Sequence, residues 1–290
     1  MSRESRHEDR HRPAAKPYRP QDRGNRRGDA AAHARHDRHL RAARARPARG
    51  EPVPPGWHWC FFVPLAPRSV LGADGLPTSG GVLPEMPLPR RMFAGQAYTF
   101  HAPILVGDAL RRETELSDIQ LREGGTGTML FTTVTRRIYT PRGLAVTEDQ
   151  HTVFREAVDP AAPVRAPKRD PAPTDVAWRR TITTDPVTLF RYSALTLNPH
   201  RIHYDRTYAM QEEGYPGLVV HGPFSQQCLL DLLRDNLPGK AIRTFTMRAR
   251  APLFDTAPFT VVGRPTAEGA EVWAVGPDGG IAMQATATLG

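Results

Sequence analysis

The chain has 290 residues, enough for one large domain or two ordinary ones, and its formal net charge is +9 with a pI near 10.1. Its two cysteines, Cys60 and Cys228, show no CxxC or Cys/His spacing, so neither a disulfide framework nor a zinc site is suggested, and a reducing cytoplasm fits best. No stretch approaches about 18 consecutive apolar residues and the N-terminus lacks the apolar run of a secretory signal, so no membrane-spanning segment is expected.

The basic charge is concentrated at the N-terminus. Residues 1–50 hold 15 of the 39 Lys and Arg and 6 of the 30 Asp and Glu, so residues 51–290 carry 24 of each and are formally neutral. The N-terminal stretch is nearly free of Ile, Val, Leu and Phe, and such segments bury too little apolar surface to fold. We predict a disordered basic tail at 1–50. A basic arm is the alternative, but its binding would be purely electrostatic, so neither a specific nucleic acid nor a membrane is expected as a partner.

Residues 51–158 form the first predicted domain, and their pattern is typical of antiparallel β-structure. An irregular, aromatic-rich entry at 54–62 precedes four strand-like runs that are separated by Gly and Pro turns. These runs cover residues 97–104, 110–121, 127–139 and 145–155. Residues 159–174 are rich in Pro, Ala and Arg, which predicts a linker to a second domain.

Residues 175–290 form the second predicted domain. Asp185-Pro186 is typical of an N-cap followed by Pro at the first helical position, and it predicts a short helix through Tyr192. In residues 224–237 apolar side chains recur three and four apart, which predicts a buried helix that ends at a Pro-Gly pair. Strands are expected at residues 178–184, 242–251, 259–264, 271–275 and 281–289.

A dense group of polar side chains lies in the otherwise apolar stretch 190–205. Asn198-Pro199 favours a turn and places His200 and His203 on a loop, where histidine can act as a general acid or base near neutral pH. A surface turn whose histidines only cap backbone groups is the alternative. The two histidines lack a third ligand at a recognised spacing, and no phosphate loop or serine-hydrolase elbow is present, so neither a metal nor a cofactor is expected.

The same stretch carries a family resemblance. Residues 190–205 and 213–223 resemble the MaoC-like, hydratase-2 branch of the hotdog superfamily. Within it they are most similar to mitochondrial-type 3-hydroxyacyl-thioester dehydratases and to itaconyl-CoA or mesaconyl-C4-CoA hydratases. The similarity extends to residues 54–59, 88–92, 248–249 and 252–255. It implies an α+β double hotdog in which each half is an antiparallel sheet wrapped around a helix.

The resemblance also implies roles for residues of the polar loop. The family motif has a catalytic Asp shortly before a catalytic His, and matching that His to His203 puts Asn198 at the Asp position. An amide cannot act as a general base, so Asn198 is expected to orient water or substrate while His203 transfers the proton. A competing alignment would put Thr196 at the Asp position and Arg201 at the His position, and it would lose the titratable group.

Further expected contacts surround the start of the long helix. The Gly222 amide would bind the thioester carbonyl, because a helix N-terminus has unpaired N–H groups and a favourable dipole. A glycine that only relieves crowding is the alternative. His221, Arg201, Arg191 and Tyr192 are the expected substrate-binding residues, with an arginine needed for any substrate carboxylate.

The resemblance predicts a hydro-lyase, either an enoyl-thioester hydratase or a 3-hydroxyacyl-thioester dehydratase. The expected substrate is a branched dicarboxylic acyl-CoA of the mesaconyl-C4-CoA or itaconyl-CoA type, and CoA enters only as part of it. The alternatives are a 3-hydroxyacyl-ACP dehydratase, a thioesterase and a non-catalytic acyl-CoA-binding domain. The first half lacks an Asn/His counterpart and is expected to contribute packing and part of the acyl or CoA pocket. The sequence leaves open whether two chains pair as a homodimer.

Overall fold

The computed structural model describes residues 26–27, 48–78, 81–124, 127–157 and 169–290. Most of the predicted basic tail and most of the predicted linker therefore lie outside the described residues. Within the tail, Arg26–Arg27 forms β1, a two-residue strand that pairs antiparallel with β3 (Ala109–Gly124), where the sequence predicted no strand.

Four long strands make up the N-terminal half. They are β2 (Arg90–Phe100), β3, β4 (Gly127–Thr140) and β5 (Gly143–Arg155). The last three lie where they were predicted, but β2 begins at Arg90 rather than at residue 97. A register shift after Phe93 interrupts the alternation of this strand. Gly95 follows the shift, and a Cβ at this position would lie 2.7 Å from the Met247 carbonyl oxygen, so glycine permits close approach to the neighbouring strand β7 (Ile242–Ala249).

The C-terminal half carries the α-helices. Its elements are β6 (Trp178–Ile182), α2 (Pro186–Thr196), the 3-10 turn η3 (Arg201–His203), α3 (Arg206–Gln211), α4 (Gly222–Asn236), β7, β8 (Phe259–Pro265), β9 (Gly269–Val275) and β10 (Ile281–Leu289). The predicted N-cap of α2 is present, since the Asp185 side chain accepts a hydrogen bond from the Thr188 amide at 2.6 Å. The helix continues to Thr196 rather than ending at Tyr192.

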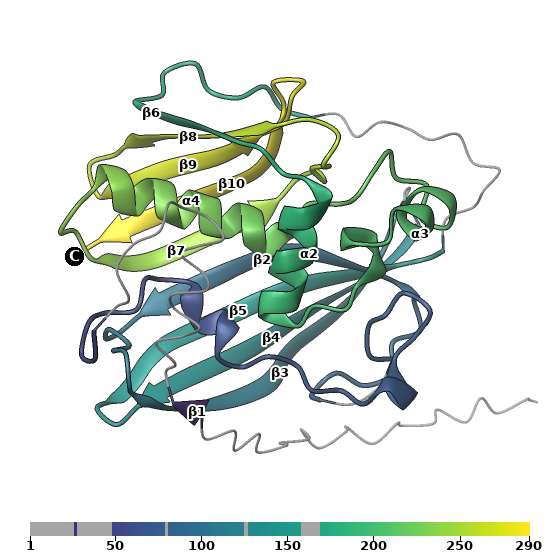
Figure 1. Ribbon diagram of the computed structural model, residues 1–290, viewed down its shortest axis with the longest axis horizontal. Helices are drawn as coiled ribbons and strands as arrows, with labels where there is room; N and C mark the ends of the chain where they lie inside the picture. Colours follow the sequence, from purple (N-terminus) through teal and green to yellow (C-terminus); the bar gives the residue numbers. More distant parts are fainter. Residues whose placement is uncertain (1–25, 28–47, 79–80, 125–126, 158–168) are drawn as a thin grey trace, which may run out of the picture.

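Helix α4 is the buried helix predicted from the three- and four-residue spacing. Its residues from Phe224 to Leu233 are all buried, because it lies across the strands β7 to β10 (Figure 1). The polar side chains within this stretch, Ser225, Gln226, Gln227 and Asp231, are buried as well. Gln226 donates a hydrogen bond of 2.8 Å to the Tyr98 hydroxyl of β2, so α4 contacts both halves of the chain.

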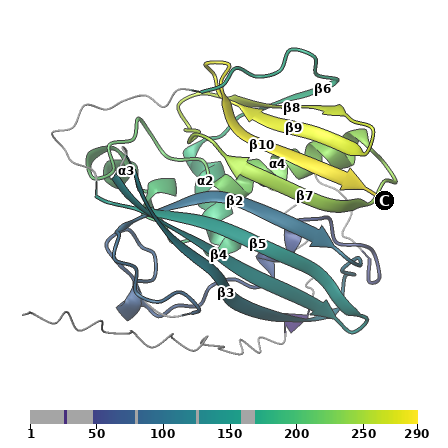
Figure 2. The ribbon, with the colours of Figure 1, turned by 180° about the vertical axis from the view of Figure 1, so that it is seen from behind.

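The two halves share one sheet. Its ten strands follow the order β1-β3-β4-β5-β2-β7-β10-β9-β8-β6, and β2 pairs antiparallel with β7 at the junction. At that junction the buried Tyr98 stands opposite the buried Phe245, so the apolar core is continuous across the halves. Seen from behind, the sheet is unbroken and α2 and α4 both lie on its far side (Figure 2).

The α+β class, an antiparallel sheet with helices, is confirmed, but the expectation that each half surrounds its own helix is not met. Among the described residues between 48 and 157, the helical segments are the 3-10 turns η1 (Trp57–Cys60) and η2 (Arg68–Val70). The nine prolines in residues 52–89 remove main-chain donors that an α-helix requires. Helix α2 of the C-terminal half lies in front of this part of the sheet instead (Figure 1).

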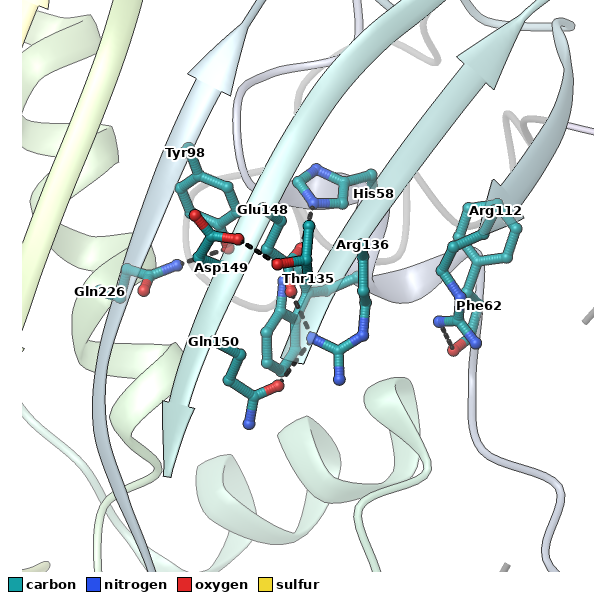
Figure 3. Close-up of polar contacts among 11 residues, drawn as sticks. His58, Phe62, Tyr98, Arg112, Thr135, Arg136, Glu148, Asp149, Gln150 and Gln226 are labelled. Atoms are coloured by element: carbon teal, nitrogen blue, oxygen red, sulfur yellow. Dashed lines mark hydrogen bonds and ion pairs between the residues drawn. The ribbon is translucent and has the colours of Figure 1, made fainter. Parts of the chain in front are cut away.

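A buried ionic cluster connects η1 to the N-terminal half of the sheet (Figure 3). Glu148 of β5 accepts hydrogen bonds from His58 at 3.0 Å and from Arg136 of β4 at 2.6 Å. Burial raises the pKa of Glu148, but the charge of Arg136 and the hydrogen bond from His58 outweigh this effect and lower the pKa to about 2. The carboxylate is therefore charged and fully paired in the folded protein.

Candidate active site

The turn predicted at Asn198-Pro199 follows α2 directly. Leu197 adopts a left-handed conformation (φ 50°) that ends the helix, and the Asn198 amide donates to the Ser193 carbonyl at 2.9 Å. The Asn198 side-chain oxygen accepts a hydrogen bond of 3.1 Å from the His200 amide, which is an Asx turn. Its NH2 group has no hydrogen-bond partner among the described residues. Asn198 therefore shapes the loop with its oxygen and keeps its N–H donors available.

His203 lies in η3 and is 7% exposed. Its Nδ1 donates to the Val219 carbonyl at 2.8 Å. Because a carbonyl can only accept, the proton is on Nδ1 and the lone pair is on Nε2. Burial, and then the neighbouring His200, lower the pKa of His203 to about 3, although the bond to Val219 opposes them. His203 is thus neutral near pH 7, with Nε2 able to accept a proton.

His221 lies directly against His203. The two rings stack with centroids 3.7 Å apart and planes 18° apart. The His221 Nε2 is 2.8 Å from the Ser193 hydroxyl, whereas its buried Nδ1 has no hydrogen-bond partner within the described part of the chain. Burial, and then His203 and His200, hold the pKa of His221 well below its ordinary value. An unsatisfied buried nitrogen is costly, so Nδ1 is a candidate position for a further hydrogen bond.

His200 extends this row of imidazoles. Its ring meets His203 edge-on, with centroids 5.5 Å apart and planes 86° apart. Burial, and then the nearby Arg91 of β2, lower the pKa of His200 to about 4. The site is therefore a row of neutral histidines beside a guanidinium.

Gly222 is the first residue of α4, two residues before the predicted helix start at 224, and its amide lies at the helix N-terminus as expected. The N-cap residue His221 makes no side-chain capping bond, so the Gly222 amide receives no hydrogen-bond partner from that side chain. The structure also shows a steric reason for glycine. A Cβ on Gly222 would lie 2.4 Å from Phe93 of β2, so a larger residue would displace that ring. The two interpretations of Gly222 are compatible. The close approach of Phe93 requires a residue without a side chain, and glycine still provides its main-chain amide at the helix start.

The other expected substrate contacts are placed differently. Arg201 binds Asp205 through Nε and Nη2 at 3.0 and 2.7 Å, and its Nη1 donates to the Ala73 carbonyl at 3.0 Å. Arg201 therefore holds the loop, which differs from the predicted contact with a substrate carboxylate. Arg191 is exposed on α2. Tyr192 is buried, and its ring packs edge-on against His221 with centroids 4.8 Å apart, so it positions that histidine.

Part of the site comes from the N-terminal half, which was expected to contribute packing and part of the acyl or CoA pocket, but the residues involved were not predicted. The Arg201 amide donates to the Asp74 carbonyl at 2.8 Å. Gly75 (φ 87°) packs so closely that a Cβ would lie 2.1 Å from the Pro199 carbonyl oxygen. Residues 73–75 therefore support the histidine loop. The run at 88–92 was part of the family resemblance and could have indicated β2, but its contact with the helix start is a long-range feature.

The three histidines of the candidate site and Gly222 all lie in the part of the chain that matches a protein family. Residues 56–255, more than half of the chain, match the family described as hydroxyacyl-thioester dehydratase type 2. The chain belongs to this dehydratase family. The resemblance predicted from residues 190–223 is confirmed.

Individual members of this and related families extend the comparison. The protein is 47% identical over 245 residues to the mesaconyl-C(4)-CoA hydratase of Chloroflexus aurantiacus, covering 84% of this chain and 86% of that relative. It is 26% identical over 232 residues to the mitochondrial hydroxyacyl-thioester dehydratase type 2 of Schizosaccharomyces pombe, covering 71% and 76% of the two chains. The crystal structure of a MaoC-like dehydratase from Phytophthora capsici matches with a TM-score of 0.67 over 94% and 96% of the chains at 13% identity, which shows a shared fold.

Within the part of the chain that the structure describes, no group of three or more His, Cys, Asp or Glu residues is arranged to hold a metal ion. No helix there combines the length and the apolar character needed to cross a membrane.

Proposed function

We propose that this dehydratase-family protein is an enoyl-thioester hydratase, a hydro-lyase, and that its preferred substrate is mesaconyl-C4-CoA. The relative that is 47% identical over 84% of the chain supports this substrate by its name. The observation that carries the chemistry is the neutral His203, whose Nε2 lone pair stays open because Nδ1 is bonded to Val219.

Hydration requires a base for water and a donor for the negative charge that develops on the thioester oxygen. His203 Nε2 takes a proton from water while the water oxygen attacks the β-carbon, and the electron pair moves to the thioester oxygen. The Gly222 amide, at the N-terminus of α4, donates to that oxygen. Transfer of the proton from His203 to the α-carbon completes the addition of one water and restores the neutral imidazole.

Two more residues have supporting roles in this proposal. The free NH2 group of Asn198 donates to the attacking water and orients its lone pair toward the β-carbon. The unpartnered Nδ1 of His221 makes the second polar contact with substrate or water. Neither role requires a carboxylate at position 198, because His203 supplies the base.

The N-terminal half is proposed to form one wall of the acyl pocket, since Phe93 of β2 contacts the position of Gly222. We also propose a reducing cytoplasmic location, because Cys60 and Cys228 are both thiols. A homodimer stays a prediction that light scattering would decide.

The decisive test is His203→Ala, with His101→Ala as the matched control because His101 is exposed on the N-terminal half. Hydration of mesaconyl-C4-CoA, followed as loss of the enoyl-thioester absorbance, should fall at least ~100-fold in His203→Ala, because the general base is gone. The control should keep its rate, and circular dichroism should show that both variants are folded. Near-normal turnover by His203→Ala would contradict the proposal.

Further measurements separate the alternatives. Faster turnover of a carrier-protein thioester than of the CoA thioester would favour a 3-hydroxyacyl-ACP dehydratase. Release of free thiol would indicate a thioesterase. Tight binding of the CoA thioester without turnover would indicate a non-catalytic binding domain.

A further inference from the structure

Arg91 of β2 is a cation that the proposed reaction does not use. Among the residues that the structure describes, it is the one arginine that is not exposed and yet has neither a hydrogen bond nor an ion pair. Its guanidinium carbon lies 5.9 Å from the centroid of the Phe154 ring. Burial, and then repulsion by Arg136, lower the pKa of Arg91, and attraction by Asp74 offsets this only in part. A partly buried cation without a counter-ion favours the binding of an anion.

The strand register directs Arg91 toward the reacting groups. Arg91 stands opposite Phe154 and Phe93 stands opposite Thr152, so Arg91 and Phe93 share one face of β2. Phe93 contacts the position of Gly222, and Arg91 is two residues away, about 7 Å along the strand. A guanidinium at this position can reach an acyl group whose thioester oxygen is bound at the Gly222 amide.

A second observation places Arg91 near the histidines. Burial is the largest cause of the lowered pKa of His200, and the charge of Arg91 is the second. The ring of His200 contacts the ring of His203. Other arginines of the region have different surroundings. Arg90 pairs with Glu213 at 3.9 Å, and Arg201 is bound to Asp205.

We propose that Arg91 binds a carboxylate carried by the acyl group and thereby selects a dicarboxylic acyl-CoA over an uncharged enoyl-CoA of the same size. This inference rests on the proposed function and names the residue that sets its substrate class. A planar guanidinium can bind both oxygens of a carboxylate. In mesaconyl-C4-CoA the free carboxylate is attached to the β-carbon, so the same contact would orient the double bond toward His203.

The test compares mesaconyl-C4-CoA with 3-methylcrotonyl-CoA, in which a methyl group replaces the carboxylate. We expect Arg91→Met to lower kcat/KM for mesaconyl-C4-CoA at least ~100-fold, as is typical when one partner of a buried charge pair is removed. Hydration of 3-methylcrotonyl-CoA should change little. Arg91→Lys should keep part of the preference, because it retains the charge but not the bidentate geometry. Arg179→Met is the matched control, because Arg179 is exposed on β6.

Three results would overturn the inference. An equal loss on both substrates would show that Arg91 binds the CoA phosphates or supports the fold. An unchanged preference in Arg91→Met would show that the carboxylate binds elsewhere. A wild-type preference for 3-methylcrotonyl-CoA would show that the substrate carboxylate does not determine selectivity, so the proposed contact between Arg91 and that carboxylate would be wrong.

A binding measurement separates this inference from the proposed function. In a His203→Ala background, calorimetry should show tighter binding of mesaconyl-C4-CoA than of 3-methylcrotonyl-CoA, and Arg91→Met should remove the difference. If the wild type hydrates neither thioester but the difference in binding persists, the proposed reaction fails while the role of Arg91 stands. If the two thioesters bind equally, the role of Arg91 is wrong.

Discussion

Burial keeps the histidines of the site neutral, whereas a neighbouring carboxylate would favour their charged form. The pKa of His203 is lowered to about 3 and that of His200 to about 4, whereas an ordinary histidine has a pKa of about 6.5. A base of such low pKa is present in its reactive form but has a weak affinity for the proton. Stabilisation of the developing oxyanion at Gly222 must therefore provide much of the rate acceleration in the proposed mechanism.

The lowered pKa of His203 predicts a stability that depends on pH. In the unfolded chain His203 binds a proton below a pH of about 6.5, whereas in the folded protein it stays neutral down to about pH 3. The unfolded state therefore binds more protons in this window, and the free energy of unfolding falls as the pH falls, by about 1.4 kcal/mol per pH unit for such a histidine. Urea unfolding between pH 7.5 and 5 should show this loss.

His203→Gln is the comparison for the pH series, because it removes the titrating group and keeps a polar side chain. Its unfolding free energy should fall less steeply with acidification than that of the wild type. Equal slopes for the two proteins would show that His203 does not control the acid sensitivity.

At the scale of elements, the start of α4 is defined by its contact with β2. Gly222→Ala keeps the main-chain amide, but the new Cβ would lie 2.4 Å from Phe93. Overpacking of this kind destabilises by about 1–3 kcal/mol. We expect Gly222→Ala to lower both the thermal unfolding temperature and the hydration rate.

A second variant separates crowding from loss of the amide. Phe93→Leu in the Gly222→Ala background should restore stability and part of the rate, because the smaller side chain leaves room for the Cβ. Failure of Phe93→Leu to restore either property would show that the steric account of Gly222 is wrong.

At the scale of the whole molecule, the N-terminal half depends on a buried ionic cluster. Glu148→Gln would leave Arg136 without its buried counter-charge, and breaking a buried pair in this way costs about 3–5 kcal/mol. Glu115→Gln is the matched control, because Glu115 pairs with Arg137 on the same sheet but is more than a third exposed, and such pairs contribute about 1 kcal/mol or less. Denaturant unfolding should therefore separate the two variants clearly, and equal losses would contradict a stabilising role of the cluster.

The signals that were read correctly from the sequence are local ones. The Asn198-Pro199 turn, the N-cap at Asp185 and the long helix predicted over 224–237 depend on neighbouring residues, so their patterns predicted them. Strand β2 begins earlier than the predicted residue 97. The register shift after Phe93 interrupts the alternation that marks a strand, so the pattern did not indicate the true start. The N-terminal half has no α-helix among its described residues. Only the resemblance implied one there, and the local sequence patterns favoured none.

By itself, the sequence determined the family, the antiparallel α+β class and the candidates His203 and Gly222, because motif spacing and apolar periodicity are properties of short segments. Only the tertiary structure decided that His221 stacks on His203, that Arg201 supports the loop, and that Arg91 shares a face of β2 with Phe93. These relations depend on the pairing of β2 with β5 and β7 and on the packing of α4 against β2. Such contacts join residues far apart in the chain, and no periodicity within one strand or helix records them.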